Sequence, residues 1–338
     1  MTEPSGTDRG AAEPWWQRGE ERLESAVGGQ ARLRVVLVLA CVLALNSADL
    51  ATVGAVAPQL QQSLGIGNIG VGILVSTSTG IGALATIPAG MVIDRSPRVR
   101  LLAGAVAVWS IAMIVSGAAS SFLMLLLTRL ALGAIVATAF PAVASLAGDL
   151  FPSAERGRLF GYVLSGELIG VAIGFLISGT LASVSWRLSF WVLAVPGLVF
   201  AVALPRLLPE PARGGASRLP PGAGTIHSAG ELSWLPPERR PNAETGSGEQ
   251  GDVAALVERD GVAPHEDLLV RSNPNSWSLR EAIRYVLSIP TNRMLIVASA
   301  LGYFYFAGLR TFAVEYLRNR FDLGQAVASV LLVVLGAG

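Results

Sequence analysis

The sequence predicts an all-α membrane protein, and three observations support that prediction. The chain has 338 residues, of which 52% are hydrophobic and only 14% are charged, so a soluble protein of this size would lack polar surface. Several apolar segments have about the 20 residues that a helix needs to cross the hydrocarbon core of a bilayer. None of them alternates apolar and polar residues as an outer-membrane strand does. We therefore expect transmembrane helices.

Six apolar segments precede residue 210, at about 35–60, 69–93, 101–120, 122–148, 159–183 and 187–208. The tail 1–34 is polar and charged, so it does not look like a secretory signal, and the first segment should remain as an anchor. Arginines gather in this tail and in the loops after the second and fourth segments, whereas "QQSLGIGN" and "GAASS" have none. The positive-inside rule then predicts a multi-pass protein of the plasma (inner) membrane, with the tail and both arginine-bearing loops in the cytoplasm.

Composition changes after the sixth segment. Residues 209–276 are rich in proline, glycine, serine and mixed charge, which predicts a disordered cytoplasmic linker. Residues 277–293 have the pattern of an amphipathic helix at the membrane face. Residues 294–338 begin a second bundle, with a seventh span at about 294–317 and an eighth opening near Gln325. Because the eighth is too short to cross, we expect the sequence to be part of a longer protein.

Other classes of protein are excluded by composition and by missing motifs. All 25 basic residues are arginine and the net charge is +1, which gives no basic field for nucleic acid. The chain has no phosphate-binding glycine loop and no cluster of cysteine and histidine, and its single Cys41 lies in an apolar segment. We therefore predict neither an enzyme nor a metal site, and no cofactor.

A charged hairpin separates the second and third segments, in the stretch "AGMVIDRSPRVRLL". Its carboxylate and guanidinium groups predict a gating latch that closes the inner mouth of a transporter, with Asp149 at the end of the fourth segment accepting from an arginine. The alternative is a simple positive-inside anchor. The candidate latch residues are Gly90, Asp94, Arg95, Arg98, Arg100 and Asp149.

Three charged residues lie deeper in the apolar segments: Asp49, Arg129 and Glu167. Each costs about 2.5 to 3.5 kcal/mol at the centre of a membrane helix, so a function is expected. We hypothesise that Asp49 or Glu167 takes up a proton, and that Arg129 opposes this or holds an anionic group of the substrate. The alternative is a structural ion pair inside the bundle.

The seventh segment carries aromatic side chains together with Arg310, which we expect to face a cavity. Tyr303, Tyr305 and Phe306 are the candidates to line a pocket for an amphipathic ligand. The alternative is that they face lipid or pack against other helices.

Four motifs together resemble the major facilitator superfamily. The matching stretches are Gly90-x3-Asp94-Arg95-x2-Arg98-x-Arg100, Arg129-x3-Gly133, Gly161-x8-Gly170-x3-Gly174-Phe175, and "SWRLSF" at 185–190. The third resembles the family's antiporter motif, with Phe175 where proline is usual. The resemblance implies the major facilitator fold, here a six-helix N-terminal bundle plus an incomplete C-terminal bundle, with Gly161, Gly170 and Gly174 as helix-packing residues.

Within this superfamily, "DLFPSAERGR" and "LGYFYFAGLRTFAVEYLRNRF" look most like the Spinster branch, which is linked to export of lysolipids and sphingolipids. Leu50 and Val136 stand where that branch has arginine and glutamate. The resemblance implies a secondary active transporter in the lipid bilayer that moves a small amphipathic or lipid-like substrate by alternating access. Because of these two departures the proton-linked mechanism of that branch does not carry over unchanged, and we expect proton coupling from Asp49 or Glu167 and a monomeric protein. The alternatives are a drug/proton antiporter that works as an exporter, and a transport-dead membrane scaffold or sensor.

Overall fold

The computed structural model describes residues 23–213, 219, 221–222, 261 and 277–336, and within these ranges every regular element is a helix. Seven stretches are long and apolar enough to cross a membrane, as predicted. They are α2 (Gln30–Ala55), α4 (Asn68–Arg95), α5 (Arg98–Gly117), α6 (Phe122–Val136) with α7 (Ala139–Leu150), α8 (Ser153–Leu181), α9 (Trp186–Leu207) and α13 (Pro290–Phe321).

Two of the predicted spans are interrupted. The first ends at Ala55, and the short helix α3 (Ala57–Leu64) follows, with Pro58 in its first turn. The fourth is divided between α6 and α7 at residues 137–138, just before Pro141. Proline has no N–H to donate to the preceding turn, so it is tolerated in the first turn of a new helix and interrupts a continuous one. The prediction of unbroken helices over 35–60 and 122–148 was wrong at these two points.

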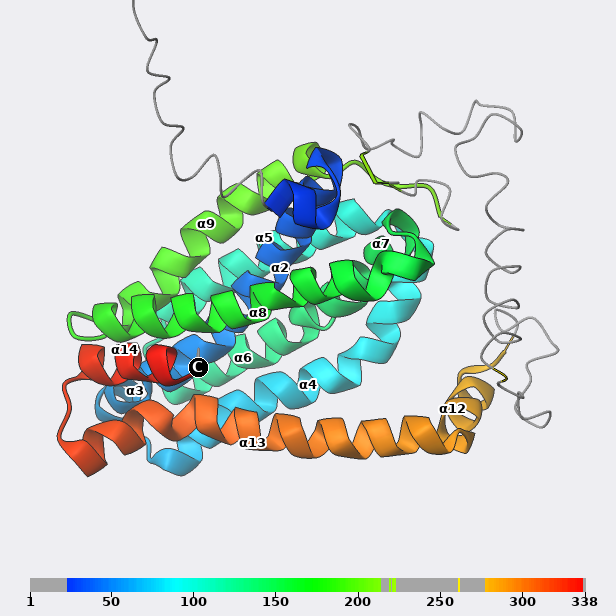
Figure 1. Cartoon of the computed structure of the whole chain (residues 1–338). Coiled ribbons are helices and arrows are strands. Elements are labelled where there is room, and N and C mark those ends of the chain that lie inside the picture. The colour runs from blue at the N-terminus through cyan, green and yellow to red at the C-terminus, as the bar shows by residue number, and fades with distance from the viewer. Residues whose placement is uncertain (1–22, 214–218, 220, 223–260, 262–276, 337–338) are drawn as a thin grey trace, which may run out of the picture.

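The spans run alternately between two ends of the bundle. We call the end that carries the turn Asp94–Arg100, between α4 and α5, the hairpin end, and the opposite end, where α3 joins α4 and α5 joins α6, the far end. Figure 1 shows α2 in the middle of the bundle with α8 along one side and α5 and α9 behind it. The most extensive pairings are α2 with α8 and α5 with α9.

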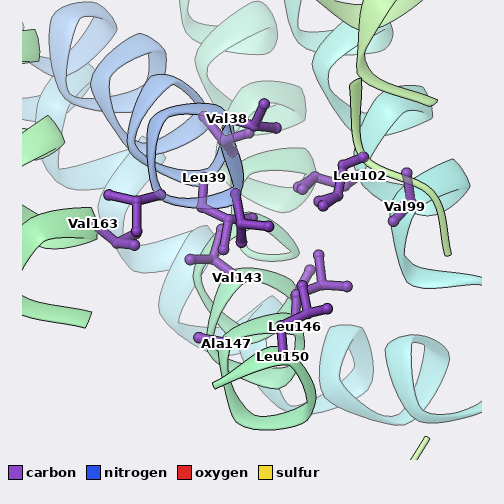
Figure 2. Packing of buried hydrophobic residues seen from close by; sticks show 14 of the residues in the cluster. Val38, Leu39, Val99, Leu102, Val143, Leu146, Ala147, Leu150 and Val163 are labelled. Atoms are coloured by element: carbon purple, nitrogen blue, oxygen red, sulfur yellow. The ribbon is translucent and has the colours of Figure 1, made fainter. Parts of the chain in front are cut away.

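Two apolar clusters fill the N-terminal bundle, one at each end. At the hairpin end, Val38 and Leu39 of α2 pack near Val143 and Leu146 of α7 (Figure 2). At the far end, a second cluster forms around Trp109, Trp186 and Phe190. The helix α2 contributes to both clusters, as do α4, α5 and α9, so these helices are packed together over most of their length.

Glycines allow α8 to lie directly against α2. A Cβ atom at any of three α8 glycines would overlap the carbonyl oxygen of an α2 alanine; the pairs are Gly166 with Ala40, Gly170 with Ala44, and Gly174 with Ala48. Such close approach of small residues is typical of helices that pack in lipid. The prediction that Gly161 is a packing residue was wrong for the described chain, because a Cβ there would meet nothing within 4 Å. Nine residues at about 100° each place it half a turn away from Gly170.

The amphipathic segment forms α12 (Leu279–Ser288), shorter than the predicted 277–293 because α13 already begins at Pro290. Ser278 and Glu281 form a capping box at its start, and the hydrogen bonds from Ser278 lower the pKa of Glu281. Its apolar side chains, Ile283 and Val286 among them, are exposed. A last helix, α14 (Gln325–Gly336), follows α13.

The start of the linker is ordered against the N-terminal bundle, so the prediction of disorder from residue 209 was wrong there. The Leu219 side chain is buried in the hairpin-end cluster, and its N–H donates to the Leu150 carbonyl at 2.8 Å. Gly222 N–H donates to the Gly28 carbonyl at 2.7 Å. Most of the remaining linker, 223–276, and residues 1–22 of the tail lie outside the described residues.

Candidate functional site

An ion pair lies in the interior of the N-terminal bundle. Arg129 Nη1 on α6 donates to Asp49 Oδ1 on α2 at 2.8 Å, and each side chain is only 2% exposed. Among the described carboxylates, Asp49 is the only one that is buried. The two residues that the sequence marked as costly charges are therefore brought together and compensate each other.

Three neighbours complete the surroundings of Arg129. Its Nη2 donates to Ser116 Oγ at 3.0 Å and lies 3.7 Å from the Met113 sulfur, both on α5. Its guanidinium carbon lies 5.2 Å from the centre of the Phe190 ring on α9, within cation–π range. The Arg129 guanidinium is thus engaged on several sides. In this conformation both Nη groups are already hydrogen-bonded, which does not favour the hypothesis from the sequence that Arg129 holds an anionic group of the substrate.

Glu167 does not join this pair. It follows Gly166, which packs at Ala40 of α2, whereas Asp49 follows Ala48, which packs at Gly174. These registers place Glu167 about two helical turns, or about 10 Å along the axis, nearer the hairpin end than Asp49. Glu167 is half-buried and has no hydrogen bond or ion pair within the described part of the chain. The two candidate proton acceptors therefore occupy separate levels.

A second buried guanidinium belongs to Arg98, the first residue of α5, which is 1% exposed. Arg98 Nη1 pairs with Asp149 at the end of α7, the partner that sequence reasoning favoured, and also donates to Ser145 Oγ at 3.2 Å. Arg98 Nε donates to Glu210 Oε1 at 3.3 Å, and Nη2 donates to the Pro211 carbonyl at 3.0 Å. One side chain thus connects α5, α7 and the start of the linker.

Glu210 was not predicted, yet it caps α5. Its carboxylate accepts from the backbone N–H of Arg98 at 2.9 Å and of Val99 at 2.7 Å. A carboxylate is stabilised at a helix N-terminus, where N–H groups lack partners within the helix. From the same segment, Arg213 donates to the carbonyls of Ile93 and Ser96 near the end of α4, at 2.8 and 2.9 Å. The linker therefore crosses both sides of the hairpin.

The remaining hairpin residues are not part of this network. Asp94, Arg95 and Arg100 are exposed, with no hydrogen bond or ion pair among the described residues. A Cβ at Gly90 would meet nothing within 4 Å. Of the six predicted latch residues, the structure brings together Arg98 and Asp149.

Arg32 is a third buried guanidinium, and sequence reasoning missed it because the first span was placed from residue 35. It is fully buried in α2, donates from Nε to the Leu219 carbonyl at 2.8 Å, and pairs with Glu155 at 2.7 Å. It fixes the linker at a second point.

On α13, one of the three predicted aromatics lines a groove. Tyr305, with Phe304 and Phe312, faces Gly72 and Val75 of α4 across a groove of about 530 Å³. Tyr303 and Phe306, which are 68% and 54% exposed, do not line this groove. Arg310 is half-buried, and its backbone carbonyl lies against Gly54 of α2.

A sequence model described as the Major Facilitator Superfamily matches residues 39–338, most of the chain. The chain belongs to the major facilitator superfamily. Human protein spinster homolog 1 is 27% identical over 212 residues, which cover 61% of this chain and 40% of that protein. A probable galactarate/D-glucarate transporter of Bacillus subtilis is 26% identical over 184 residues, covering 52% of this chain and 40% of that protein.

The major facilitator fold also has a counterpart among solved structures. A bacterial homolog of the human lysosomal transporter Spinster, in an inward-facing and unoccupied conformation, superposes with a TM-score of 0.63 at 22% identity. The match covers 89% of this chain and 58% of that chain. The chain thus spans about two fifths of the curated relatives named here, and the Spinster resemblance predicted from the sequence is confirmed.

Proposed function

We propose that this major facilitator protein is a secondary active transporter of the plasma (inner) membrane that works by alternating access of two helical bundles. The family membership and the transporters among its relatives support this proposal. The buried pair Asp49–Arg129 is the observation that carries it, because an apolar bundle that only had to be stable would gain nothing from two costly charges.

Proton coupling is the energy source that this pair supports. A carboxylate that is buried against a guanidinium can separate from it only if the negative charge of the carboxylate is neutralised. Binding of a proton neutralises this charge without bringing water into the bundle. Protonation of Asp49 would remove its charge attraction for Arg129. The guanidinium could then move closer to Ser116 and Phe190, with which it is already in contact. Glu167, half-buried and without a hydrogen bond or ion pair among the described residues, is a second acceptor nearer the hairpin end.

The Arg98 network supports an inner gate. The arginines of the hairpin and of the loop after α7 favour a cytoplasmic hairpin end. There Arg98 joins Asp149 and Glu210, whose side chains are partly exposed, so water can replace their hydrogen bonds when the gate changes state. We therefore propose that the hairpin-end network is a reversible latch that holds the start of the linker against the N-terminal bundle.

For the substrate, an amphipathic or lipid-like solute fits best. The groove between α4 and α13 is lined mainly by apolar and aromatic residues, with Tyr305, Ser76 and Thr311 as its polar groups. A sugar diacid, the substrate class in the name of the Bacillus subtilis relative, would need a cationic partner, and the lining of this groove contains no charged residue.

A liposome assay tests the proposal. The full-length protein is reconstituted with a pH-sensitive dye inside, and a lysophospholipid, a sphingoid base, galactarate and a cationic drug are added in turn. We expect one of the two lipids to cause proton movement, and Asp49→Asn to abolish it because the amide cannot exchange a proton. Glu281→Gln, at an exposed carboxylate on α12, is the matched control and should leave the signal unchanged.

The same panel separates the alternatives. Proton movement with the cationic drug alone would favour a drug/proton antiporter, and movement with galactarate alone would refute the lipid-like substrate. If none of the four compounds moves protons, and none is itself taken up by vesicles carrying folded protein, the scaffold or sensor is favoured instead.

A further inference from the structure

The second unit, residues 290–336, touches the N-terminal bundle at the far end. In Figure 1, α13 lies beside the beginning of α4 at that end and diverges from α4 toward α12. The described contacts agree, because Thr311, Ala313 and Val314 are buried while residues 294–309 of α13 are mostly exposed. The two units are therefore closed against each other at one end only.

The point of closest approach lies between α2 and α13. A Cβ at Gly54 would overlap the backbone carbonyl oxygen of Arg310 and lie 3.2 Å from the Thr311 Cα. Only a glycine lets two helix backbones come this near. Val314, one turn further, packs with Ala51 and Phe175 in a cluster that both units share.

Glu315 of α13 lies beside this contact, and its side chain reaches the N-terminal bundle. With the Asn68 amide oriented to suit its neighbours, Nδ2 is 2.9 Å and 3.1 Å from the two carboxylate oxygens of Glu315. In this orientation Asn68 Nδ2 also lies 2.5 Å from the side-chain amide of Gln61 on α3, which then presents its oxygen as the acceptor. Amide donors to an ionised carboxylate form stronger hydrogen bonds than neutral pairs do, so Glu315 ties α13 to α4, and Asn68 continues the link to α3.

The next helix closes the same end. Gln325 donates its side-chain amide to the Ala55 carbonyl, beside the break between α2 and α3. The fully buried Ser329 of α14 lies where a Cβ at Gly179 of α8 would overlap it. Four elements of the N-terminal bundle thus meet α13 and α14 within one region.

We propose that Glu315, held by Asn68, is the polar latch of an outer gate, and that the Gly54–Arg310 backbone contact is the point at which this gate seals. The inference rests on the proposed transport function and extends it. Alternating access requires the far end to open when the hairpin end closes. Breaking the Glu315 hydrogen bonds should therefore shift the population toward an outward-open state.

Thiol labelling of the full-length protein in intact cells tests this latch. The reporter is Ser329→Cys in a Cys41→Ala background, a near-isosteric change at a side chain that only an open far end would expose. We expect Glu315→Ala to raise its rate of reaction with a membrane-impermeant maleimide by about tenfold, because hydrogen bonds to a charged group are lost. Asn68→Ala should act in the same direction, and the two changes together should not add, because they remove the same bonds.

Asn319→Ala is the matched control, since this exposed residue lies one turn beyond Glu315 and has no hydrogen bond among the described residues. Ser120→Cys, in the exposed far-end loop, reports outer accessibility and should react at the same rate in every background. Equal labelling of Ser329→Cys with and without Glu315 would overturn the latch, as would an equal rise with Asn319→Ala. The assay needs neither substrate nor proton movement, so its result is independent of the liposome experiment.

Discussion

Arg98 and Arg129 are both buried guanidiniums, but their surroundings differ. Arg129 pairs with a single carboxylate that is as buried as itself, between apolar helices. Arg98 pairs with two carboxylates, Asp149 and Glu210, whose side chains are 15% and 24% exposed at the end of the bundle. Burial of the arginine is therefore not what distinguishes the two sites. The exposure of the partner carboxylate determines whether water can replace the ion pair.

This difference separates two kinds of switch. When an Arg98 contact breaks, water can solvate the carboxylate that is left, so the cost is small and the network can reform. When the Arg129 contact breaks, an uncompensated charge remains in a low-dielectric interior. The hairpin end is suited to repeated opening, whereas the centre is suited to a change of protonation.

The largest expected effect tests the centre. Asp49→Ala leaves Arg129 without its carboxylate and should lower the free energy of unfolding by about 3–5 kcal/mol. Denaturant unfolding in detergent measures it. Adding Arg129→Leu should recover much of the loss, because the uncompensated charge is removed as well. If Asp49→Ala costs no more than Asp94→Ala, at an exposed carboxylate of the hairpin, the contrast between the two arginines is wrong.

A smaller effect is expected at the hairpin end. Glu210→Gln removes a charged acceptor from the Arg98 and Val99 N–H groups but leaves Asp149 to pair with Arg98, so we expect a loss of about 1.5–3 kcal/mol in the same assay. Asp94→Asn is the control and should change little, because Asp94 lies in the same hairpin and has no hydrogen bond or ion pair within the described part of the chain. A loss for Glu210→Gln as large as that for Asp49→Ala would show that partner exposure does not matter.

Ser116→Ala measures the support around Arg129. It removes the hydroxyl that accepts from Nη2 and that also donates to Thr128 Oγ1 on α6, and we expect a loss of about 1 kcal/mol from the two bonds together. Ser110→Ala, on the same helix, removes a hydroxyl that bonds only to the Val106 carbonyl one turn earlier, and should cost less. Equal losses would mean that Ser116 contributes packing and no specific support to the guanidinium.

Salt should produce the smallest effect and sharpen the same comparison. Raising ionic strength from about 0.1 M to 1 M shortens the Debye length to about 3 Å and screens partly exposed pairs far more than buried ones. The stability difference between wild type and Glu210→Gln should shrink by a few tenths of a kcal/mol, about the size of an exposed pair. The difference for Asp49→Ala should stay constant. Unfolding titrations at the two salt concentrations measure both.

The number and order of the spans could be predicted from the sequence, because hydrophobic length determines which segments can cross a bilayer. Helix bounds were less accessible. Arg32 was placed outside the first span since an arginine lowers local hydropathy, yet α2 begins at Gln30 and buries this side chain with Glu155 and Leu219 as partners. Those partners lie far along the chain, and hydropathy contains no information about them.

The candidate site was predictable in its residue types and less so in its contacts. The cost of charge in the membrane identified Asp49 and Arg129, but which charges pair depends on how α2 and α6 rotate against each other. Glu210 could not be found by composition, because a short ordered segment at the start of a proline-rich linker looks like the rest of that linker. An acid two residues after the predicted span, and three residues before Arg213, was the only local signal.

The bond from Arg32 to Leu219 has a consequence for biosynthesis, since 187 residues separate its two ends along the chain. At about 5–20 residues per second, about 10 to 40 s pass between synthesis of the arginine and synthesis of its carbonyl partner. The helix α2 is made early in that interval, and Glu155 is synthesised later within it. The carbonyl of Leu219 in the linker is the last acceptor of Arg32 to be made. The N-terminal bundle is therefore completed by a segment that is translated after all six of its spans.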